Sequence, residues 1–241
     1  MNLLVLGKGK MGSTVIELAR ERGHNVEAHD EFDNAGSCQL TAERLRGIDV
    51  VADFTWPGVV LGNISACAAA GINILVGTTG WYDKVDQVRA QVEKSGIGFL
   101  YGANFSIGVN LFYRLVESAG ELFRGLGDYD AFIEEAHHAL KRDAPSGTAL
   151  ELGRRLAARL GHEVPIASTR AGHIPGVHRV GFDSAEDQVM LVHTARSREG
   201  FAAGALAAAG WLAAGNRGVH TFAAVLDQIL DWERREGRDR R

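Results

Sequence analysis

The sequence has little cysteine and no excess of positive charge. Its two cysteines, Cys38 and Cys67, are far apart in a chain of 241 residues. Such a pair makes neither a disulfide framework nor a metal-binding motif, so we expect a protein of a reducing compartment, the cytoplasm. The formal net charge is -4 and the isoelectric point about 6.1. This acidic balance gives no global electrostatic basis for binding nucleic acid.

Long apolar runs are also lacking. The apolar start of the chain is interrupted by glycines after a few residues, which is too soon for the core of a signal peptide. The alanine-rich segment 201–215 comes closest to a membrane span, but glycines break it, and a span needs roughly 18 apolar residues. We therefore expect no membrane partner and interpret 201–215 as a buried helix.

The first hundred residues alternate short aliphatic runs with helical patterns. Strands are predicted at 2–7, 25–30, 49–54, 73–79 and 98–104, and helices at 11–23, 58–70 and 83–95. This alternation is typical of a parallel sheet that is covered by helices on both faces. The fold class expected is therefore α/β.

The pattern changes after Asn104. Helices are predicted at 105–126, 147–161, 198–215 and 221–234, and strands at 129–138, 176–184 and 186–197. The last two strand segments alternate apolar and polar residues, which is typical of antiparallel strands with one buried face. The charged tail 233–241 is expected to fray. We predict an α+β domain of residues 106–201, with residues 1–105 plus 202–241 forming the other domain.

The segment GKGKMG is the clearest binding motif of the first half. It places Gly7, Gly9 and Gly12 in G-x-G-x-x-G spacing, after a predicted strand and at the start of a predicted helix. Glycines there let the backbone approach a pyrophosphate, and the helix N-terminus offers unpaired N–H groups. Asp30 ends the next strand, where its carboxylate can accept hydrogen bonds from ribose hydroxyls. We therefore predict a Rossmann-like dinucleotide-binding domain.

The predicted coenzyme is NADH or NADPH, with a preference for NADH. The residues after Asp30, EFDNAGS, contain no arginine or lysine for a 2′-phosphate. Lys8 and Lys10 leave NADPH open, because either could meet that phosphate. Small residues at two further strand ends, 77–80 and 102–106, leave room for a nicotinamide ring, although each could be a simple turn.

The segment 134–153, EEAHHALKRDAPSGTALELG, gathers groups that suit a small dianion. His137 and His138 are adjacent, and in an extended strand their side chains point to opposite sides, so one can hold the anion while the other addresses the reacting centre. Lys141 adds a compact cation three residues later. A helix that begins at Gly147 presents free N–H groups to a carboxylate.

Simpler interpretations of this segment stay open. Ser146 and Thr148 could be helix caps alone, and Thr148 with Glu151 fits a capping box. A metal site from His137, His138 and Asp143 is disfavoured, because adjacent histidines lack the i, i+4 spacing that places two ligands on one helix face. We expect no metal.

Two other histidines, His178 and His193, lie on predicted strands. We interpret them as structural or as part of a pocket rim, because polar residues near a surface rarely require a function.

Segment 134–150 closely resembles the E-x-H-H-x-x-K-x-D-A-P-S-G-T-A signature of the 4-hydroxy-tetrahydrodipicolinate reductase (dihydrodipicolinate reductase) family of lysine and diaminopimelate biosynthesis. The resemblance runs over nearly the whole chain. It extends to KMG in the glycine loop, DFTWP (53–57), GTTG (77–80), ANFSIGVN (103–110), RAGHIPGVHRVGF (170–182) and HTARSREGFAAGAL (193–206).

The resemblance implies a fold and a reaction. The fold is an N-terminal Rossmann-like dinucleotide-binding domain with a second α+β domain that binds substrate and builds a homotetramer. The reaction is the NAD(P)H-dependent reduction of a cyclic imine that bears two carboxylates. His137 is similar to the family's proton donor or acceptor, and Lys141 to its proton donor.

The resemblance also implies binding residues. The substrate contacts would be His138, Ser146, Gly147 and Thr148. The coenzyme contacts would be Gly7, Lys8, Gly9, Lys10, Met11, Gly12, Asp30, Gly77, Thr78, Thr79, Gly102, Ala103, Asn104 and Phe105. Two departures from the family pattern bear on coenzyme preference: the glycine loop is one residue shorter than in many members, and Glu31 rather than an arginine follows Asp30.

Three other functions are weighed against this reading. A dehydrogenase for another cyclic imine or keto acid would keep the coenzyme site but lose the HHALK and SGT groups. An NAD-sensing regulator would need a basic DNA-binding helix or a partner surface, which the acidic balance does not supply. A hydrolase would need a nucleophile elbow or a metal set, and the sequence has no G-x-S-x-G.

Overall fold

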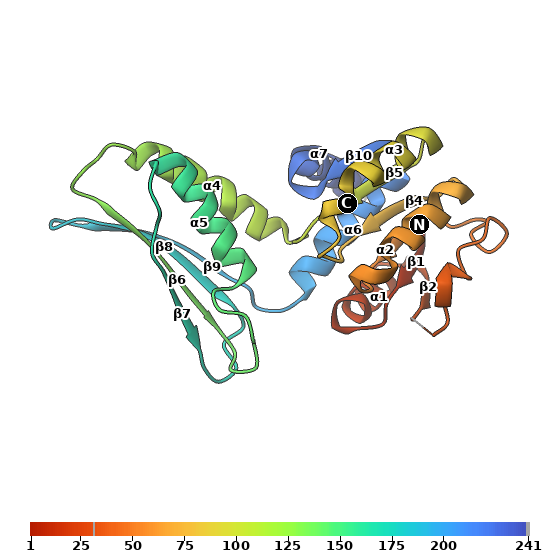
Figure 1. Ribbon diagram of the computed structural model, residues 1–241, viewed down its shortest axis with the longest axis horizontal. Helices are drawn as coiled ribbons and strands as arrows, with labels where there is room; N and C mark the ends of the chain where they lie inside the picture. Colours follow the sequence, from red (N-terminus) through yellow and green to blue (C-terminus); the bar gives the residue numbers. More distant parts are fainter. Residues whose placement is uncertain (31, 240–241) are drawn as a thin grey trace. The chain divides into compact units, whose positions relative to one another are not determined.

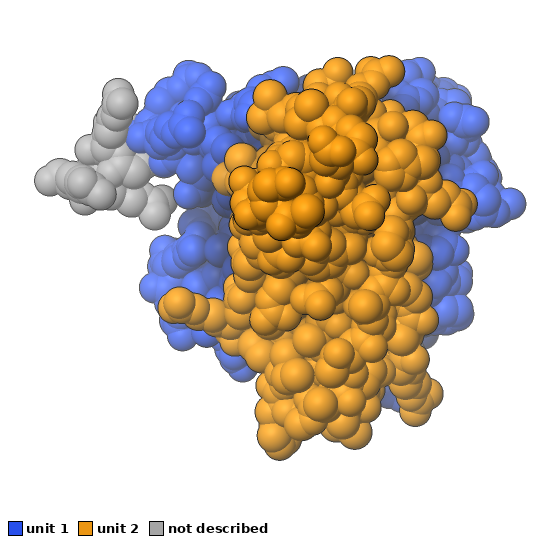
Figure 2. Space-filling view, turned by 90° about the vertical axis from the view of Figure 1, so that its left-hand side faces the viewer, with its two compact units in different colours: residues 1–107, 198–241 blue, residues 108–197 orange. Residues whose placement is uncertain are grey.

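In the computed structural model, which describes residues 1–30 and 32–239, the strands gather into two separate sheets. Each sheet belongs to its own compact unit. Unit 1 consists of Met1–Ile107 and the segment from Arg198 onward, and unit 2 of Gly108–Ser197 (Figure 2).

The sheet of unit 1 is parallel throughout and has six strands in the order β10-β5-β4-β3-β1-β2. The strands are β1 (Asn2–Leu6), β2 (Asn25–His29), β3 (Val50–Asp53), β4 (Asn73–Val76), β5 (Gly98–Tyr101) and β10 (Gly218–Thr221). The order steps away from β1 in both directions, as in a doubly wound nucleotide-binding sheet. The α/β prediction is confirmed.

Helices cover both faces of this sheet (Figure 1). One face carries α1 (Lys10–Glu21), α6 (Glu199–Ala213) and α7 (Phe222–Asp239), and the other carries α2 (Pro57–Ala70) and α3 (Val85–Ser95). Successive strand residues point to opposite faces, so Leu3 and Val5 join the first core, whereas Leu4 and Leu6 join the second. Each such buried aliphatic side chain contributes about 1.5–3 kcal/mol relative to exposure.

Unit 2 contains a mixed four-stranded sheet in the order β7-β6-β8-β9. Its elements are α4 (Ile107–Phe123), β6 (Asp130–His137), α5 (Gly147–Leu160), β7 (Ile166–Arg170), β8 (Val177–Asp183) and β9 (Gln188–Thr194). β6 runs parallel to β7 and antiparallel to β8, which is antiparallel to β9. Phe112 of α4 and Leu156 of α5 share one core with Ile133 and Val180 of the strands. The predicted α+β architecture and antiparallel pair are confirmed.

The alanine-rich segment forms α6, most of which is buried against the sheet of unit 1. The prediction of a buried helix is therefore correct. Among the described helices, none combines the length and the hydropathy of a membrane-spanning segment.

Two edge strands, β7 and β10, were not predicted. Their sequences, IASTR and GVHT, are short and have no continuous apolar run. Each becomes a strand by pairing with a stronger neighbour, β7 with β6 and β10 with β5. Pairing between segments distant in the sequence therefore decided both elements.

Several predicted boundaries are wrong. β4 ends at Val76 and β5 at Tyr101, so residues 77–79 and 102–104 are loops. Helix α7 continues through Asp239, which contradicts the expected fraying of residues 233–239. Residues 240–241 and Glu31 lie outside the described residues.

Gly12→Ala should destabilise unit 1. A Cβ atom at position 12 would lie 1.8 Å from the Gly7 carbonyl oxygen, and overpacking that moves a backbone typically costs about 1–3 kcal/mol. Gly9→Ala is the matched control in the same loop, because a Cβ there meets no described atom within 4 Å. Urea unfolding followed by tryptophan fluorescence reports on unit 1, which holds all four tryptophans. Equal unfolding midpoints for the two variants would contradict the prediction.

Candidate active site

Four strand ends of unit 1 bring the residues predicted to bind a coenzyme to one edge of the sheet. Parallel strands have their carboxyl ends at the same edge, where ligands of such sheets bind. Gly7–Gly9 follow β1, Asp30 follows β2, Gly77–Thr79 follow β4 and Gly102–Phe105 follow β5. Lys10–Gly12 form the first turn of α1.

The glycine loop is shaped for close approach of a ligand. Gly7 has a φ of +92°, and a Cβ atom there would lie 2.6 Å from the Phe54 carbonyl oxygen. Gly9 is extended and immediately precedes α1. A Cβ atom at Gly9 would meet no described atom within 4 Å, so there is free space beside the first N–H groups of the helix. These features fit a pyrophosphate at the helix N-terminus.

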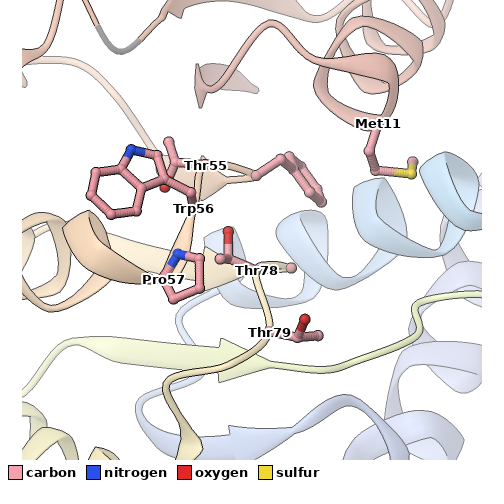
Figure 3. Close-up of a pocket in the computed structure, with 8 residues that line it drawn as sticks. Met11, Thr55, Trp56, Pro57, Thr78 and Thr79 are labelled. Carbon is pink, nitrogen blue, oxygen red and sulfur yellow. The ribbon is translucent and has the colours of Figure 1, made fainter. Parts of the chain in front are cut away.

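A cavity of about 340 Å³ adjoins this loop (Figure 3). It lies between the start of α1 and the loops after β3 and β4. Its lining residues are Met11, Phe54, Thr55, Trp56, Pro57, Gly77, Thr78 and Thr79. Residues 54–57 were not predicted as site residues, although they belong to the DFTWP segment of the resemblance.

Behind this cavity lies the fully buried carboxylate of Asp53. It accepts hydrogen bonds from the Thr55 N–H (2.9 Å), the Thr55 hydroxyl (2.5 Å), Asn63 Nδ2 (2.8 Å) and the Thr78 hydroxyl (3.4 Å). Burial raises the pKa of Asp53, and these hydrogen bonds oppose that rise. The carboxylate thus joins the loops after β3 and β4 that form the cavity wall.

Asp30 is paired with a lysine of the glycine loop. Lys8 Nζ lies 3.4 Å from Asp30 Oδ2 and 2.9 Å from Asp33 Oδ2. The backbone N–H groups of Asp33 and Phe32 donate to Asp30 Oδ1, both at 3.0 Å. These N–H groups, with Lys8, lower the pKa of Asp30, so its carboxylate is ionised and can accept hydrogen bonds.

Among the residues predicted to bind coenzyme, Phe105 has an aromatic side chain that belongs to the hydrophobic core. Its side chain is buried in the core of unit 1 and packs against Phe222 with ring centroids 5.0 Å apart. Its backbone carbonyl faces Gly204, where a Cβ atom would lie 1.8 Å from that oxygen.

In unit 2, the helix-covered face of the sheet changes from apolar to polar along β6. Side chains of a strand alternate between faces, so Ala131 and Ile133 share their face with Glu135 and His137. Ala131 and Ile133 belong to the hydrophobic core, and Glu135 and His137 continue the same row of side chains past the end of that core. His178 lies opposite Glu135 on β8 and is also buried.

Glu135 is the most enclosed polar group of this row. Its side chain is 0% exposed, and both carboxylate oxygens accept from Arg170: Nη1 at 2.9 Å and Nη2 at 2.7 Å. The Ser146 N–H donates to it at 3.3 Å, and His137 Nδ1 is a further partner. Burial alone raises the pKa of Glu135, but the hydrogen bonds from Arg170, Ser168 and His137 outweigh burial and lower the pKa to about 2.

The three polar groups beside this carboxylate lie close together. The rings of His137 and His178 are 5.1 Å apart and T-shaped, and His178 Nε2 lies 3.1 Å from Ser146 Oγ. Burial lowers the pKa of both histidines, that of His178 to about 4. Both imidazoles are therefore neutral near pH 7.

The loop between β6 and α5 carries the predicted cation. Lys141 Nζ pairs with Asp143 Oδ1 at 2.9 Å, and the Lys141 N–H donates to the His138 carbonyl oxygen at 3.1 Å. Arg170 Nη2 donates to the Asp143 carbonyl oxygen at 2.6 Å. His138 and Lys141 thus share one turn, which Arg170 attaches to the sheet.

The predicted capping box of α5 is wrong. Ser146 is extended (φ -67°, ψ 153°), and its hydroxyl accepts from the Ala149 N–H at 3.2 Å, so it is the N-cap. Thr148 therefore lies inside the helix, where it shares a hydrogen bond with Tyr113. Glu151 pairs instead with Arg154 and Arg155. Gly147 is the first residue of the helix, as predicted.

Glu135, His137 and His178 present atoms of the kind that bind metals, all within 4.8 Å of one another. The guanidinium of Arg170 already occupies both oxygens of Glu135. A cation in that place makes the group a hydrogen-bonded network rather than a metal site. The disfavoured set from the sequence, with His138 and Asp143, is not the set that the fold brings together.

The chain matches one family over most of its length. Family models of the N-terminus and the C-terminus of dihydrodipicolinate reductase match residues 1–105 and 108–226, respectively. The 4-hydroxy-tetrahydrodipicolinate reductase of Christiangramia forsetii is 35% identical to it, over 95% of this chain and 99% of that protein. The chain belongs to the dihydrodipicolinate reductase family. The resemblance inferred from the sequence is thereby confirmed.

Solved structures show the fold of the family. The dipicolinate-bound dihydrodipicolinate reductase of Paenisporosarcina sp. superposes with a TM-score of 0.76 at 21% identity, over 92% of this chain and 98% of that one. An amine dehydrogenase of Mycobacterium smegmatis superposes with a TM-score of 0.60 at 10% identity, over 93% and 95% of the two chains. Family membership and the Rossmann-like unit together imply a nicotinamide coenzyme.

For this member of the dihydrodipicolinate reductase family, sequence reasoning missed three residues of the network. Glu135 and Arg170 were quoted within motifs of the resemblance but given no role, and His178 was interpreted as structural or as part of a pocket rim, with no partner named. Period-two alternation along IEEAH could have placed Glu135 and His137 on one face. Arg170 opens one of the quoted motifs, but nothing in the sequence indicated its contact with Glu135, because the strand that carries Arg170 was not predicted.

The stability of unit 2 should fall as the pH drops from 7 to 5. Because burial lowers the pKa of His178 from 6.5 to about 4, only the unfolded chain gains a proton in this range, which favours unfolding. Hydrogen exchange of β8 peptides, corrected for intrinsic rates, should therefore speed up at pH 5. His178→Gln should reduce this pH dependence without abolishing it, because His137 and His193 shift in the same direction.

The matched control for this experiment is His162→Gln, which changes an exposed histidine of the same unit. It should leave the pH dependence of exchange in β8 unchanged. If His178→Gln behaves like this control, the buried imidazole does not limit the acid stability of unit 2.

Proposed function

We propose that the protein reduces 4-hydroxy-tetrahydrodipicolinate (dihydrodipicolinate) to tetrahydrodipicolinate with NADH or NADPH, in the cytoplasmic biosynthesis of lysine and diaminopimelate. The observation that carries the proposal is that Glu135 contacts both His137 and the N–H of Ser146, the N-cap of α5, while the charge of Lys141 acts on His137, in a chain of this family. Unit 1 is assigned to the coenzyme and unit 2 to the substrate.

The coenzyme would be held by the sheet edge of unit 1. The glycine loop and the first turn of α1 suit its pyrophosphate, and the cavity beside Thr78 and Thr79 suits its nicotinamide. When bound, the reduced coenzyme supplies a hydride. The ionised Asp30 favours a ribose with free hydroxyls, which supports a preference for NADH. Lys8 partly neutralises Asp30, which leaves room for use of NADPH.

The substrate would be held by the positive end of α5 and the turn that precedes it. Gly147 and Thr148 lie in the first turn of the helix, where backbone N–H groups suit a carboxylate. His138 and Lys141 lie in one turn and can contact the second carboxylate. Ser146 contributes by starting the helix at this point, since its hydroxyl caps the first turn.

The proton that completes the reduction would come from His137 or Lys141. Both belong to the polar end of unit 2, and the charge of Lys141 acts on the ring of His137. A dianionic substrate beside Lys141 favours the ammonium form, so substrate binding helps to keep this donor protonated.

We also propose a homotetramer built through the open face of the unit 2 sheet. Helices α4 and α5 cover one face of the sheet (Figure 1). Strand alternation places Met190 and Val192 on the other face, where Val192 is 54% exposed. Light scattering of the purified protein measures the number of chains, and a monomer would contradict this part of the proposal.

The reaction is tested by absorbance at 340 nm with purified protein, product freshly made by a coupled synthase, and NADH or NADPH in parallel. Oxidation that requires the synthase product is expected, faster with NADH. No oxidation with either coenzyme, from protein that binds NADH, would move the assignment to a dehydrogenase for another substrate. Dipicolinate, the ligand of the Paenisporosarcina protein, serves as a non-reducible competitor.

His137→Ala and Lys141→Ala should each lower kcat by about 10²–10⁴-fold, the usual contribution of a positioned proton-transfer group. The same coupled assay measures kcat and KM for both variants. Arg142→Ala is the control, because Arg142 is an exposed cation next to Lys141 in the sequence. A variant whose kcat equals that of the wild type removes that residue from the proton transfer.

A further inference from the structure

The buried carboxylate of Glu135 contacts His137, one of the two residues assigned to the proton transfer. We propose that Glu135 is a positioning residue: held by Arg170, it fixes His137 as the tautomer with its proton on Nδ1, so that Nε2 carries the lone pair. The inference rests on the proposed function for its catalytic consequence, but the tautomer itself can be measured without any activity.

The contacts of Glu135 determine what it can do for His137. An ionised carboxylate only accepts hydrogen bonds, and an arginine guanidinium only donates them. Arg170 donates to both oxygens, at 2.9 and 2.7 Å, and the Ser146 N–H donates at 3.3 Å. With such donors the carboxyl stays ionised well below neutral pH. The contact between Glu135 and His137 Nδ1 therefore requires a proton on Nδ1.

The state of His137 follows from this contact. Its side chain is 12% exposed, and burial lowers its pKa, as do the charges of Lys141 and Arg170. A neutral imidazole with its proton on Nδ1 has an acceptor at Nε2. His137 thus accepts a hydrogen bond at Nε2 and does not give up a proton there, and Lys141, whose ammonium pairs with Asp143, supplies the proton that completes the reduction.

The same carboxylate also connects three segments of the site. His137 ends strand β6, Ser146 caps α5, and Arg170 ends β7 while donating to the Asp143 carbonyl oxygen at 2.6 Å. One buried ion pair thus holds the strand end, the turn that carries Lys141 and the helix N-terminus. A solvent-exposed ion pair would hold these segments less firmly, since exposed pairs contribute little to the free energy of folding.

Gly176 adds an independent constraint on the imidazole. A Cβ atom at this position would lie 3.3 Å from both Cδ2 and Nε2 of His137, so the backbone there packs closely against the ring edge. The ring therefore has Glu135 on its Nδ1 side and the Gly176 backbone near its Nε2 side. This packing restricts rotation of the ring and supports a single orientation.

The decisive variant is Glu135→Gln. Oε1 of Glu135 accepts from Arg170 Nη2 and the Ser146 N–H, whereas Oε2 accepts from Arg170 Nη1 and contacts His137 Nδ1. Because only the imidazole can change its protonated nitrogen, the carbonyl oxygen of the new amide takes the Oε1 position and its NH2 group takes the Oε2 position, facing His137 Nδ1. An N–H directed at Nδ1 moves the imidazole proton to Nε2. We expect kcat to fall by about 10²–10⁴-fold with KM nearly unchanged, whereas Glu135→Asp, which keeps the charge, should retain the wild-type tautomer and lose less activity.

The control is Glu134→Gln on the same strand. Glu134 is 49% exposed and lies 3.8 Å from Arg179, so its loss should leave kcat and the tautomer unchanged. NADH binding, measured by fluorescence, should be equal in all three variants, because the coenzyme is assigned to unit 1.

Nitrogen NMR of His137, assigned by comparison with His137→Gln, measures the tautomer directly. In the wild type at neutral pH we expect a pyrrole-type Nδ1 and an imine-type Nε2, and in Glu135→Gln the reverse. A wild type with its proton on Nε2 would overturn the inference, as would a Glu135→Gln enzyme with unchanged kcat. If Glu135→Gln does not fold, the wild-type spectrum still decides the tautomer.

The spectrum also separates this inference from the proposed function. If the wild type shows the expected tautomer but does not reduce the synthase product, the assignment of substrate fails and that of the tautomer stands. If the enzyme is active but His137 carries its proton on Nε2, the assignment of the tautomer fails and that of the substrate stands.

Discussion

The ion pair between Glu135 and Arg170 is the interaction on which the polar end of unit 2 depends. An unpaired carboxylate at that depth would be too costly to ionise, and a neutral one could not hold Arg170 in a bidentate contact. Paired, it orients His137 and attaches both the Lys141 turn and the start of α5 to the sheet. The polar end of unit 2 is thus organised by one buried charge rather than by its individual loops.

Unit 1 uses a buried carboxylate for a related purpose but with different chemistry. Asp53 receives its hydrogen bonds from hydroxyl, amide and backbone groups, and burial raises its pKa. Glu135 has a guanidinium partner, and its pKa falls to about 2. Both carboxylates connect loops that emerge from strand ends. The contrast shows that the charge of the partner, more than depth alone, decides the ionisation of a buried acid.

The two units also use strand geometry in different ways. In unit 1 the parallel strands bring four loops to one edge, so residues distant in the sequence lie at the same edge of the sheet. In unit 2 the alternation along β6 continues the row of Ile133 into Glu135 and His137. A single strand thus contributes both to the hydrophobic core and to the polar site, and its register fixes which residues face each other.

The amino-acid sequence by itself determined the α/β class, the glycine loop before α1, the strand that ends near His137 and the helix that begins at Gly147, because each depends on local periodicity or turn chemistry. The tertiary structure decided the rest. Strands β7 and β10 exist through pairing with distant strands, and Ser146 rather than Thr148 caps α5 because its backbone is extended and its hydroxyl accepts from the Ala149 N–H. Arg170 meets Glu135 only because β7 lies beside β6, and no spacing along the chain encodes a contact between residues 35 positions apart.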